Sequence, residues 1–213
     1  IVMMCMFFLA LYAFSFKIAN EELIINKKTI ETVSTSVTDK IVIIDAGHGT
    51  PDEGAESKNG VTEAQINLKI AFKLQKLLEQ SGCKVVMTRT DENEIYDEGS
   101  NTISEKKISD MKNRVKIGNE SNADIFVSIH LNQIDQTDCY GWQTFYNKIN
   151  ENSKILATYI QNNLNQIIQK ENKRIPAMLN TVYLMKNVKI PITIVECGFL
   201  SNPEEEKLLQ TDE

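Results

Sequence analysis

The chain contains little histidine, cysteine and proline. Two histidines, four cysteines and four prolines occur among its 213 residues. Cys5 lies in an apolar N-terminal run, which leaves Cys83, Cys139 and Cys197, an odd number at wide spacing. This pattern excludes a disulfide-stapled fold and lacks the close cysteine pairs of a cysteine-based zinc site. We therefore expect these three residues to be buried thiols outside any disulfide.

Dense runs of lysine and arginine are also missing from the chain. The formal net charge is −6 and the sequence pI is about 5.1, which makes nucleic acid a poor candidate partner. The acidity itself is typical of a solvated surface. A hydrophobic fraction of 42% describes a globular chain that can bury a full core.

The N-terminus differs in composition from the remainder. Residues 1–16 are apolar and carry no charge, whereas residues 17–38 are polar and rich in Asn, Glu, Thr and Ser. An uncharged terminal run followed by a polar stretch favours an export signal or membrane anchor over a buried helix. We expect residues 1–16 to be that segment, 17–38 a linker and 39–213 the functional domain. The protein is then exported, either secreted or membrane-anchored.

Apolar runs alternate with amphipathic stretches along residues 39–213. The runs predict strands at Lys40–Asp45, Lys84–Thr88, Asp124–His130, Gly141–Tyr146, Thr181–Met185 and Pro191–Glu196. Helices are predicted from Thr62 to the stop signal Gly82, at Ser109–Asn119, Ser153–Ile168 and Pro203–Leu209. This alternation indicates a single α/β domain, in which a mostly parallel twisted sheet of about five or six strands is flanked by helices.

Two helices carry clear apolar stripes, and one charged stretch does not fit an element. The stripes consist of Ile66, Ile70, Leu74, Leu77 and Leu78 in one helix, and Ile155, Leu156, Tyr159, Ile160, Leu164 and Ile167 in the other. Residues 91–107 are predicted to form a surface loop. The aromatics Trp142, Phe145 and Tyr146 could line a sugar groove, although alternating aromatics in a strand are more typical of a core.

Both histidines occur where an apolar strand ends. His48 follows the first strand, His130 closes the third, and Glu196 closes the last. Because the carboxyl ends of parallel strands meet at one edge of a sheet, these side chains are predicted to converge on a crevice. Gly47 and Gly49 leave room for a ligand to approach.

Each of these residues also has a structural explanation when it is taken singly. A histidine at a strand end is commonly a loop or core residue, and an acid such as Glu63 in the first helical turn is favoured by the helix dipole. Glu196 is harder to explain, because buried carboxylates are rare unless they are paired or coordinated. Two His and one Glu with a further carboxylate suit catalytic zinc and an acid/base. We expect Asp45 to orient an imidazole.

The motifs give this constellation a specific resemblance. Residues 39–210 resemble the zinc-dependent N-acetylmuramoyl-L-alanine amidases, which are cell-wall hydrolases with an α/β fold. The matching segments are Asp45-Ala46-Gly47-His48-Gly49, Glu63 with Asn67 and Leu68, Ser128-Ile129-His130 with Asn132, and the run from Val195 to Asn202. Arg89, Arg114 with Asn119, and Gly141 also stand where the family pattern has them.

The resemblance implies the roles of the site residues. His48, Glu63 and His130 are expected to hold Zn²⁺, and Glu196 to act as the catalytic acid/base. The expected reaction is hydrolysis of the amide between N-acetylmuramic acid and L-alanine in peptidoglycan. In architecture the chain is similar to the germination-specific, CwlD-like amidases of spore formers, which help to form muramic-δ-lactam in the spore cortex.

Other functions stay open at the level of sequence. The chain could be a vegetative autolysin, another zinc peptidase or amidohydrolase, or a non-catalytic wall-binding module that depends on a partner. An activating protein partner is a further option, and the sequence does not identify one.

Overall fold

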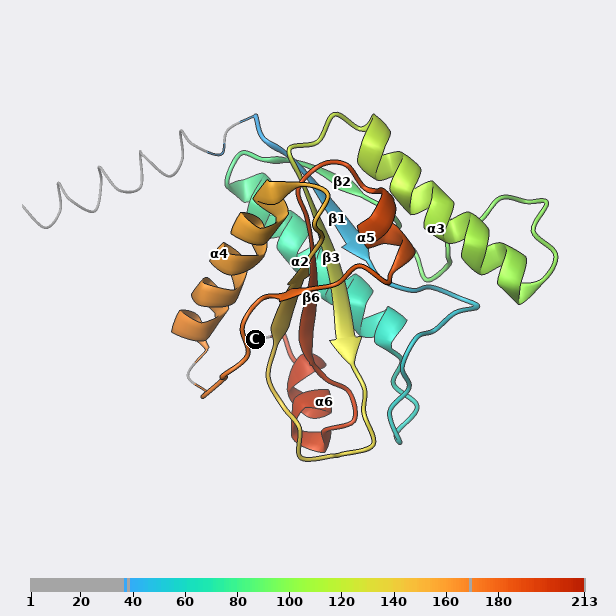
Figure 1. Ribbon diagram of the computed structural model, residues 1–213. Coiled ribbons are helices and arrows are strands. Elements are labelled where there is room, and N and C mark those ends of the chain that lie inside the picture. The colour runs from blue at the N-terminus through green and yellow to red at the C-terminus, as the bar shows by residue number, and fades with distance from the viewer. Residues whose placement is uncertain (1–36, 38, 169, 213) are drawn as a thin grey trace, which may run out of the picture. The chain divides into compact units, whose positions relative to one another are not determined.

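In the computed structural model, six strands form one sheet in the order β2-β1-β3-β6-β4-β5 (Figure 1). The structure describes residue 37, residues 39–168 and residues 170–212. The strands are β1 (Ile41–Ala46), β2 (Lys84–Met87), β3 (Ile125–Asn132), β4 (Gln143–Tyr146), β5 (Ala177–Met178) and β6 (Ile192–Phe199). The helices are α2 (Glu63–Gln80), α3 (Ile103–Glu120), α4 (Glu151–Ile167), α5 (Tyr183–Asn187) and α6 (Pro203–Leu209).

The centre of the sheet is parallel. β1 pairs in parallel with β2 and β3, and β3 pairs in parallel with β6. β4 runs antiparallel to β6 and parallel to the short edge strand β5. The predicted α/β domain with a mostly parallel sheet of five or six strands is therefore confirmed. Its carboxyl edge is defined by β1, β3 and β6, whose ends lie on the same side.

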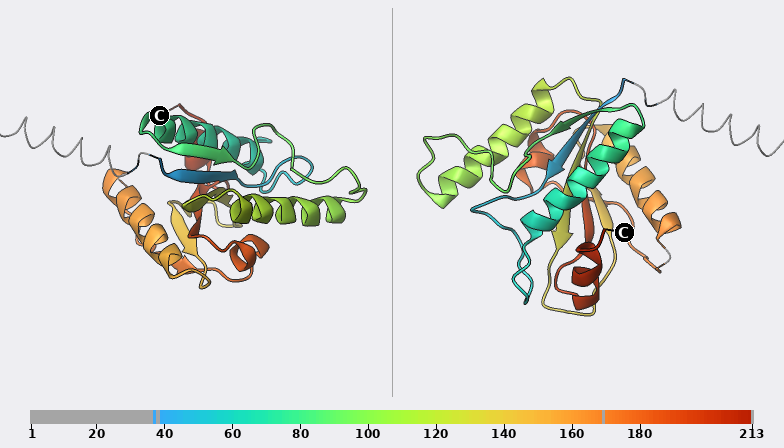
Figure 2. Two further views of the ribbon diagram at one scale, coloured as in Figure 1. Left: turned by 90° about the horizontal axis from the view of Figure 1, so that it is seen from above. Right: turned by 180° about the vertical axis from the view of Figure 1, so that it is seen from behind.

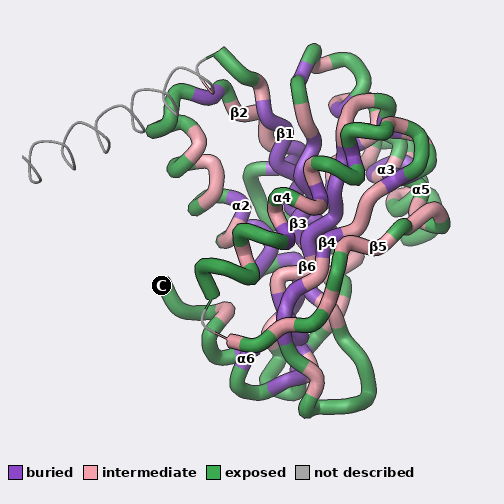
Figure 3. The backbone as a smooth tube through the Cα atoms, turned by 60° about the vertical axis from the view of Figure 1, so that its left-hand side comes forward, coloured by how far each residue is buried: buried purple, intermediate pink, exposed green. Residues whose placement is uncertain are grey.

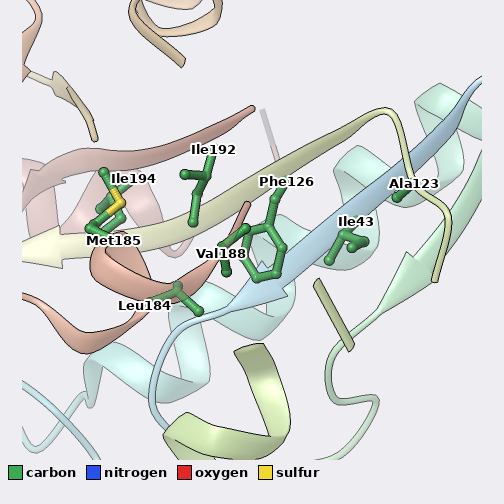
Figure 4. Packing of buried hydrophobic residues seen from close by; sticks show 8 residues of the cluster. All are labelled: Ile43, Ala123, Phe126, Leu184, Met185, Val188, Ile192 and Ile194. Atoms are coloured by element: carbon green, nitrogen blue, oxygen red, sulfur yellow. The ribbon is translucent and has the colours of Figure 1, made fainter. Parts of the chain in front are cut away.

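One face of the sheet is covered by α3 and α5 (Figure 2). Figure 4 shows the core on this face, where side chains from β1, β3 and β6 meet those of α5. The buried cluster consists of Ile43, Ala123, Phe126, Leu184, Met185, Val188, Ile192 and Ile194. Burying apolar side chains at about 25 cal/mol per Å² is the main force that holds these helices on the sheet.

The opposite face is covered by α2, with α6 beside it. Ile66 of α2 packs with Leu131 and Leu200, and Leu209 of α6 adjoins the same cluster. α4 lies on this face as well. Thr144 hydrogen bonds to α4, whereas its neighbour Phe145 packs into the core of the other face, and successive strand residues point to opposite faces.

The predicted strand Thr181–Met185 is wrong. Its second half belongs to helix α5, and the edge strand β5 lies a few residues earlier in the chain. The β-branched and aromatic side chains of this segment favour a strand locally. Leu184 and Met185 are nonetheless fully buried in the core that α5 shares with the sheet, so tertiary packing decides the conformation.

Helix α3 begins six residues before the predicted start at Ser109, which shortens the predicted loop 91–107. Thr102 caps the helix, since its side chain accepts a hydrogen bond from the Glu105 backbone and the Glu105 carboxylate accepts one from the Thr102 backbone. This reciprocal capping box stabilises the first turn. The charged residues after it form the solvated face of a helix rather than a loop.

Several residues of the predicted apolar stripes in α2 and α4 are exposed rather than buried. In α4 the buried residues are Ser153, Ala157 and Gln161, whereas Tyr159 is exposed. In α2 the buried residues cluster in the first half, and Leu77 is 61% exposed. The stripe of α4 is therefore displaced from its packed face, because Ser153 and Gln161 accept hydrogen bonds from backbone amides of the sheet and so set the orientation of this helix.

Burial in the described part of the chain follows the sheet, as Figure 3 shows. None of its helices is long and apolar enough to cross a bilayer. The predicted export segment 1–16 lies outside the described residues, as does nearly all of the linker 17–38. Cys83, Cys139 and Cys197 form no disulfide with any described residue, and Cys83 is buried while the other two are half-buried.

Candidate active site

The carboxyl edge of the sheet brings together the residues that the sequence singled out. His48 follows β1, His130 lies near the end of β3, and Glu63 is the first residue of α2. Glu196 of β6 is the direct neighbour of His130 in the paired strands. Segments up to 148 residues apart thus meet at one point, as the convergence of parallel strand ends requires.

His48, Glu63 and His130, termed here the His–Glu–His cluster, offer three ligand atoms within 4.8 Å of one another. Glu63 lies between the imidazoles. Its Oε1 is 2.9 Å from His130 Nδ1, and its Oε2 is 3.3 Å from His48 Nε2. Ligands about 2.0–2.1 Å from a tetrahedral zinc lie roughly 3.4 Å apart. The donor set and its spacing therefore fit a zinc ion.

Gly54 allows His48 and Glu63 to approach each other closely. A β-carbon on Gly54 would lie 2.7 Å from both Glu63 Oε2 and His48 Cδ2. Gly54 also has a φ of +71°, a left-handed conformation that glycine adopts without strain. His48 itself has a φ of +62°, which is uncommon for a residue with a β-carbon.

Two arginines stabilise this unusual backbone. Arg114 donates hydrogen bonds to the carbonyl oxygens of Ala46 and His48, at 2.8 Å in each case. Arg89 donates to the carbonyls of Ala46 and Gly47, at 2.9 and 3.1 Å. Both side chains are buried. The carbonyl groups of Ala46, Gly47 and His48 thus all accept hydrogen bonds from guanidinium groups. These hydrogen bonds fix the backbone position from which the His48 side chain extends.

The expectation that Asp45 orients an imidazole is wrong. Its carboxylate accepts hydrogen bonds from Arg114, Ser128 and Thr88, at 2.5–2.7 Å. Burial works to raise the pKa of Asp45, but the Arg114 charge and the two hydroxyl groups hold it below its usual value. Asp45 therefore serves as the counter-ion of the arginine that holds the His48 backbone.

Asp52 takes the place that was expected for Asp45. Its Oδ2 lies 3.5 Å from Nδ1 of His48, the ring nitrogen that faces away from Glu63, and 2.6 Å from Lys107 Nζ of α3. A carboxylate on the outer nitrogen of a ligating histidine fixes the tautomer and the ring orientation. Sequence analysis missed Asp52, although it follows His48 by four residues within the same glycine-rich loop.

Glu63 is held in its charged form. Burial raises the pKa of its carboxyl group, but hydrogen bonds with His130 and then His48 outweigh burial and bring that pKa well below its usual range. The backbone amides of Ala55 and Leu131 donate further hydrogen bonds to its two oxygens. For His130, burial lowers the pKa and the hydrogen bond to Glu63 raises it, with a net upward shift. Glu63 is thus a buried anion, suited to balance a cation.

Glu196 has a different environment. Burial is the main cause that raises the pKa of its carboxyl group above the usual value. Its Oε2 is buried and has no hydrogen-bond partner among the described residues. An unpaired buried carboxylate oxygen costs free energy, so this atom is available to a group that enters the site. A carboxyl group with a raised pKa beside a donor cluster can accept and return a proton.

The aromatic residues of the β4 region belong to the core. Trp142 is buried, with its Nε1 donating to Asn165, and Phe145 packs against the core of the α3 and α5 face. Of the two interpretations that the sequence left open, the structure supports the core for Trp142 and Phe145, while Tyr146 is half-buried.

Comparison with known proteins agrees with the fold. Residues 42–213 match the N-acetylmuramoyl-L-alanine amidase family. The chain is 35% identical over 204 residues to a germination-specific N-acetylmuramoyl-L-alanine amidase of Bacillus subtilis (strain 168), covering 95% of this chain and 82% of that protein.

Solved structures give the same result. The CwlD amidase from Clostridioides difficile, in complex with the GerS lipoprotein, is 44% identical with a TM-score of 0.78, over 81% of this chain and 89% of that chain. An N-acetylmuramoyl-L-alanine amidase from Clostridium difficile 630 is 32% identical with a TM-score of 0.70, over 82% and 88% of the two chains.

An α/β domain that gathers two histidines and two glutamates at its carboxyl edge has the composition of a hydrolase active site. The match over most of its length shows that the chain belongs to the N-acetylmuramoyl-L-alanine amidase family. Within that family it resembles the germination-specific, CwlD-like enzymes.

Proposed function

We propose that the protein is a zinc-dependent amidase that hydrolyses the bond between N-acetylmuramic acid and the L-alanine of peptidoglycan stem peptides. His48, Glu63 and His130 would hold the ion, and Glu196 would act as acid and base. The observation that carries this proposal is the tight His–Glu–His cluster with the unpaired Glu196 oxygen on the neighbouring strand.

A bound zinc ion would supply a Lewis acid that polarises the lactyl carbonyl and acidifies water at neutral pH. The donor set of two histidines and one glutamate suits this use, since it leaves a coordination position open. Glu63 contributes the negative charge of the set, and Asp52 and Arg114 keep the His48 ring and backbone in position.

The chain's own acid and base is Glu196. As a carboxylate it takes a proton from the water that attacks the carbonyl carbon. It then gives that proton to the nitrogen of L-alanine as the C–N bond breaks, which leaves a lactyl carboxylate and a free amino group. A raised pKa suits both steps, because the group must hold a proton between them at near-neutral pH.

We place the reaction in the formation of muramic-δ-lactam in the spore cortex. Similarity to a germination-specific amidase of Bacillus subtilis (strain 168) and to the CwlD amidase from Clostridioides difficile supports this assignment. Removing the peptide exposes the lactyl carboxyl group, which is the group that a lactam ring requires.

The proposed location rests on the composition of residues 1–38, and the proposed partner on a solved complex of a relative. We propose an exported protein in which residues 1–16 are a signal or membrane anchor, 17–38 a linker and 39–213 the catalytic domain. The CwlD amidase from Clostridioides difficile is found in complex with the GerS lipoprotein, and we propose that an envelope lipoprotein binds this chain and activates it.

The test is the metal content of the purified full chain, together with analysis of muropeptide products before and after zinc addition. One zinc per chain and release of intact stem peptides from muramic acid are expected. Cleavage within the stem peptide would replace the proposal with a zinc peptidase. Zinc binding without release would call for the lipoprotein partner, and the absence of both zinc and release would indicate a wall-binding module.

A further inference from the structure

A surface cavity of about 550 Å³ opens between two connecting segments of the described chain. One wall is the connection from β3 to β4, with Asp138, Cys139 and Tyr140, and the other is the connection from α4 to β5, with Glu171 to Arg174. Its volume lies in the range of about 300–1,000 Å³ that is typical of sites for drug-sized molecules. No family motif of the amidases accounts for these residues.

The cavity lies at the carboxyl edge of the sheet, because its two walls lead into the starts of β4 and β5, and β4 pairs antiparallel with β6. The guanidinium of Arg174 stacks on the ring of Phe199, with Cζ 4.8 Å from the ring centroid. Phe199 ends β6 and pairs with Asn132 at the end of β3. It follows Glu196 by three residues, which corresponds to about 10 Å along an extended strand. An extended peptide of about three residues spans that distance, so a substrate held at Glu196 can reach the cavity.

Hydrogen bonds connect the wall formed by the α4–β5 connection to the start of β4, the strand that pairs with β6 at Glu196. Asn172 Nδ2 donates to the Trp142 carbonyl at 2.7 Å, and Gln143 Nε2 donates to the Ile175 carbonyl at 3.0 Å. Gln143 is the partner of Glu196 in the β4–β6 pair. The position of the wall relative to the catalytic carboxylate is therefore set by the sheet itself.

The guanidinium group of Arg174 has donors left for an anion. Its Nη1 donates to the Tyr140 carbonyl, and this is the single hydrogen bond of the guanidinium within the described part of the chain. Arg174 is one of the residues that line the cavity. Arginine's planar fork matches a carboxylate with two parallel hydrogen bonds. Lys170 Nζ lies 4.1 Å from the centroid of the Tyr140 ring, but its charge is paired with Glu205 at 3.7 Å.

The charges in the cavity lining indicate whether the cavity suits the glycan or the stem peptide of the substrate. In the intact substrate the sugars are N-acetylated and the lactyl carboxyl group is already consumed in the amide, so the glycan is neutral. All charges lie on the stem peptide, which carries free carboxylates. The charged residues of the lining are Asp138, Glu171, Lys173 and Arg174, and the other four lining residues are uncharged. Lys173 pairs with Glu171, so Arg174 is the lining cation without an ion pair among the described residues. An arginine in this state complements a peptide carboxylate and gains little from a neutral glycan.

We propose that this cavity is the subsite for the stem peptide, and that Arg174 binds one of the peptide's free carboxylates. The assignment rests on the proposed amidase function and adds a specificity determinant to it. Arg174 binds in the ground state and the transition state alike, because it lies about three peptide residues from the bond that breaks. Its loss should therefore raise KM and leave kcat unchanged.

The test compares two soluble disaccharide muropeptides, one with free peptide carboxylates and one with those groups converted to carboxamides. We expect Arg174→Gln in the full chain to raise KM for the acidic substrate about tenfold, and to change it less than about twofold for the amidated one. Arg174→Lys, which keeps the charge without the fork, should fall between. Lys154→Gln, an exposed cation on α4, should behave as wild type.

Equal KM values for wild type and Arg174→Gln, or equal losses on both substrates, would overturn the proposal. A second measurement keeps it separate from the amidase assignment. Calorimetric titration of free stem peptide into the full chain carrying Glu196→Gln, with and without Arg174→Gln, needs no turnover. If wild type binds no zinc and cleaves neither substrate, the amidase proposal fails, while a peptide affinity that Arg174→Gln lowers about tenfold still supports the subsite. An affinity unchanged by Arg174→Gln rejects it.

Discussion

Gly47 and His130 approach so closely that a β-carbon at residue 47 would lie 2.3 Å from Cε1 and Nε2 of the imidazole. The Gly47 amide also donates to the Ile129 carbonyl at 3.0 Å, so the backbone cannot withdraw without breaking the pairing of β1 with β3. The end of β1 is therefore one wall of the site, and it positions a histidine that a different strand supplies.

Gly47→Ala should displace the His130 ring and weaken zinc binding by about 10- to 100-fold, the usual cost of disturbing the surroundings of a ligand. Competition with a chromogenic chelator measures this affinity. Gly99→Ala is the matched control, because nothing lies within 4 Å of a β-carbon at that position. Wild-type affinity in Gly47→Ala would contradict the placement of His130 at the metal.

His130→Ala should lower the zinc content of the purified protein well below one ion per chain, because it removes one of the three proposed protein ligands. Metal analysis after dialysis against a weak chelator gives the stoichiometry. Thr137→Ala, an exposed residue in the connection that follows β3, should keep the wild-type content. An unchanged stoichiometry in His130→Ala would exclude it as a ligand.

Glu196→Gln should keep zinc and lose turnover by about 10²- to 10⁴-fold, since the amide cannot take and return the proton. Release of stem peptides from muropeptides, measured beside metal content, separates the two effects. Glu204→Gln alters an exposed carboxylate of α6 and should leave both unchanged. Near-normal activity of Glu196→Gln would remove it as the acid and base.

Arg114→Met should destabilise the fold by about 3–5 kcal/mol, because it leaves the buried carboxylates of Asp45 and Asp110 without their counter-ion. Urea unfolding of the full chain measures this loss. Lys173→Met removes an exposed ion pair with Glu171 and should cost less than about 1 kcal/mol. Equal effects of the two substitutions would show that the buried pair does not stabilise the domain.

Glu94 makes stability depend on pH. Burial, followed by the charges of Asp110 and Asp52, raises the pKa of its carboxyl group from 4.5 to about 7, and its Oε2 is buried without a hydrogen-bond partner among the described residues. The folded state thus binds this proton more tightly than the unfolded state. Its contribution to stability falls as the pH rises from about 4.5 to about 7 and stays low above that.

Glu94→Gln should therefore stabilise the protein more at pH 8 than at pH 5. A pKa unit corresponds to about 1.4 kcal/mol, and solvent screening around a loop carboxyl group reduces the total, so we expect a difference of about 1 to 2 kcal/mol. Denaturant unfolding at both pH values measures it. Glu92→Gln, in the same loop but exposed, should show no such pH dependence, and a matching response in both variants would reject the assignment to Glu94.

The central strands were predictable because their signal is local. β1, β3 and β6 are continuous apolar runs, as expected for strands that are covered on both faces. α5 was not predictable, since Leu184 and Met185 form one helical turn only through their packing on the sheet. The orientation of α4 was also missed, because polar residues, Ser153 and Gln161, bind the sheet and fix which side is buried.

The sequence by itself determined that His48, His130 and Glu196 meet near the carboxyl ends of parallel strands, because such strands place these ends on one edge. The predicted ends themselves were too early, since β3 continues to Asn132 and β6 to Phe199. Only the tertiary structure decided how these side chains are held. Arg114 binds the His48 backbone, and Asp52 lies beside the His48 ring. Arg174 lines the cavity that we propose for the peptide. Arg114, for example, reaches a carbonyl oxygen 66 residues away. Every residue has a backbone carbonyl, whatever its side chain, so no residue pattern along the chain can predict such a contact.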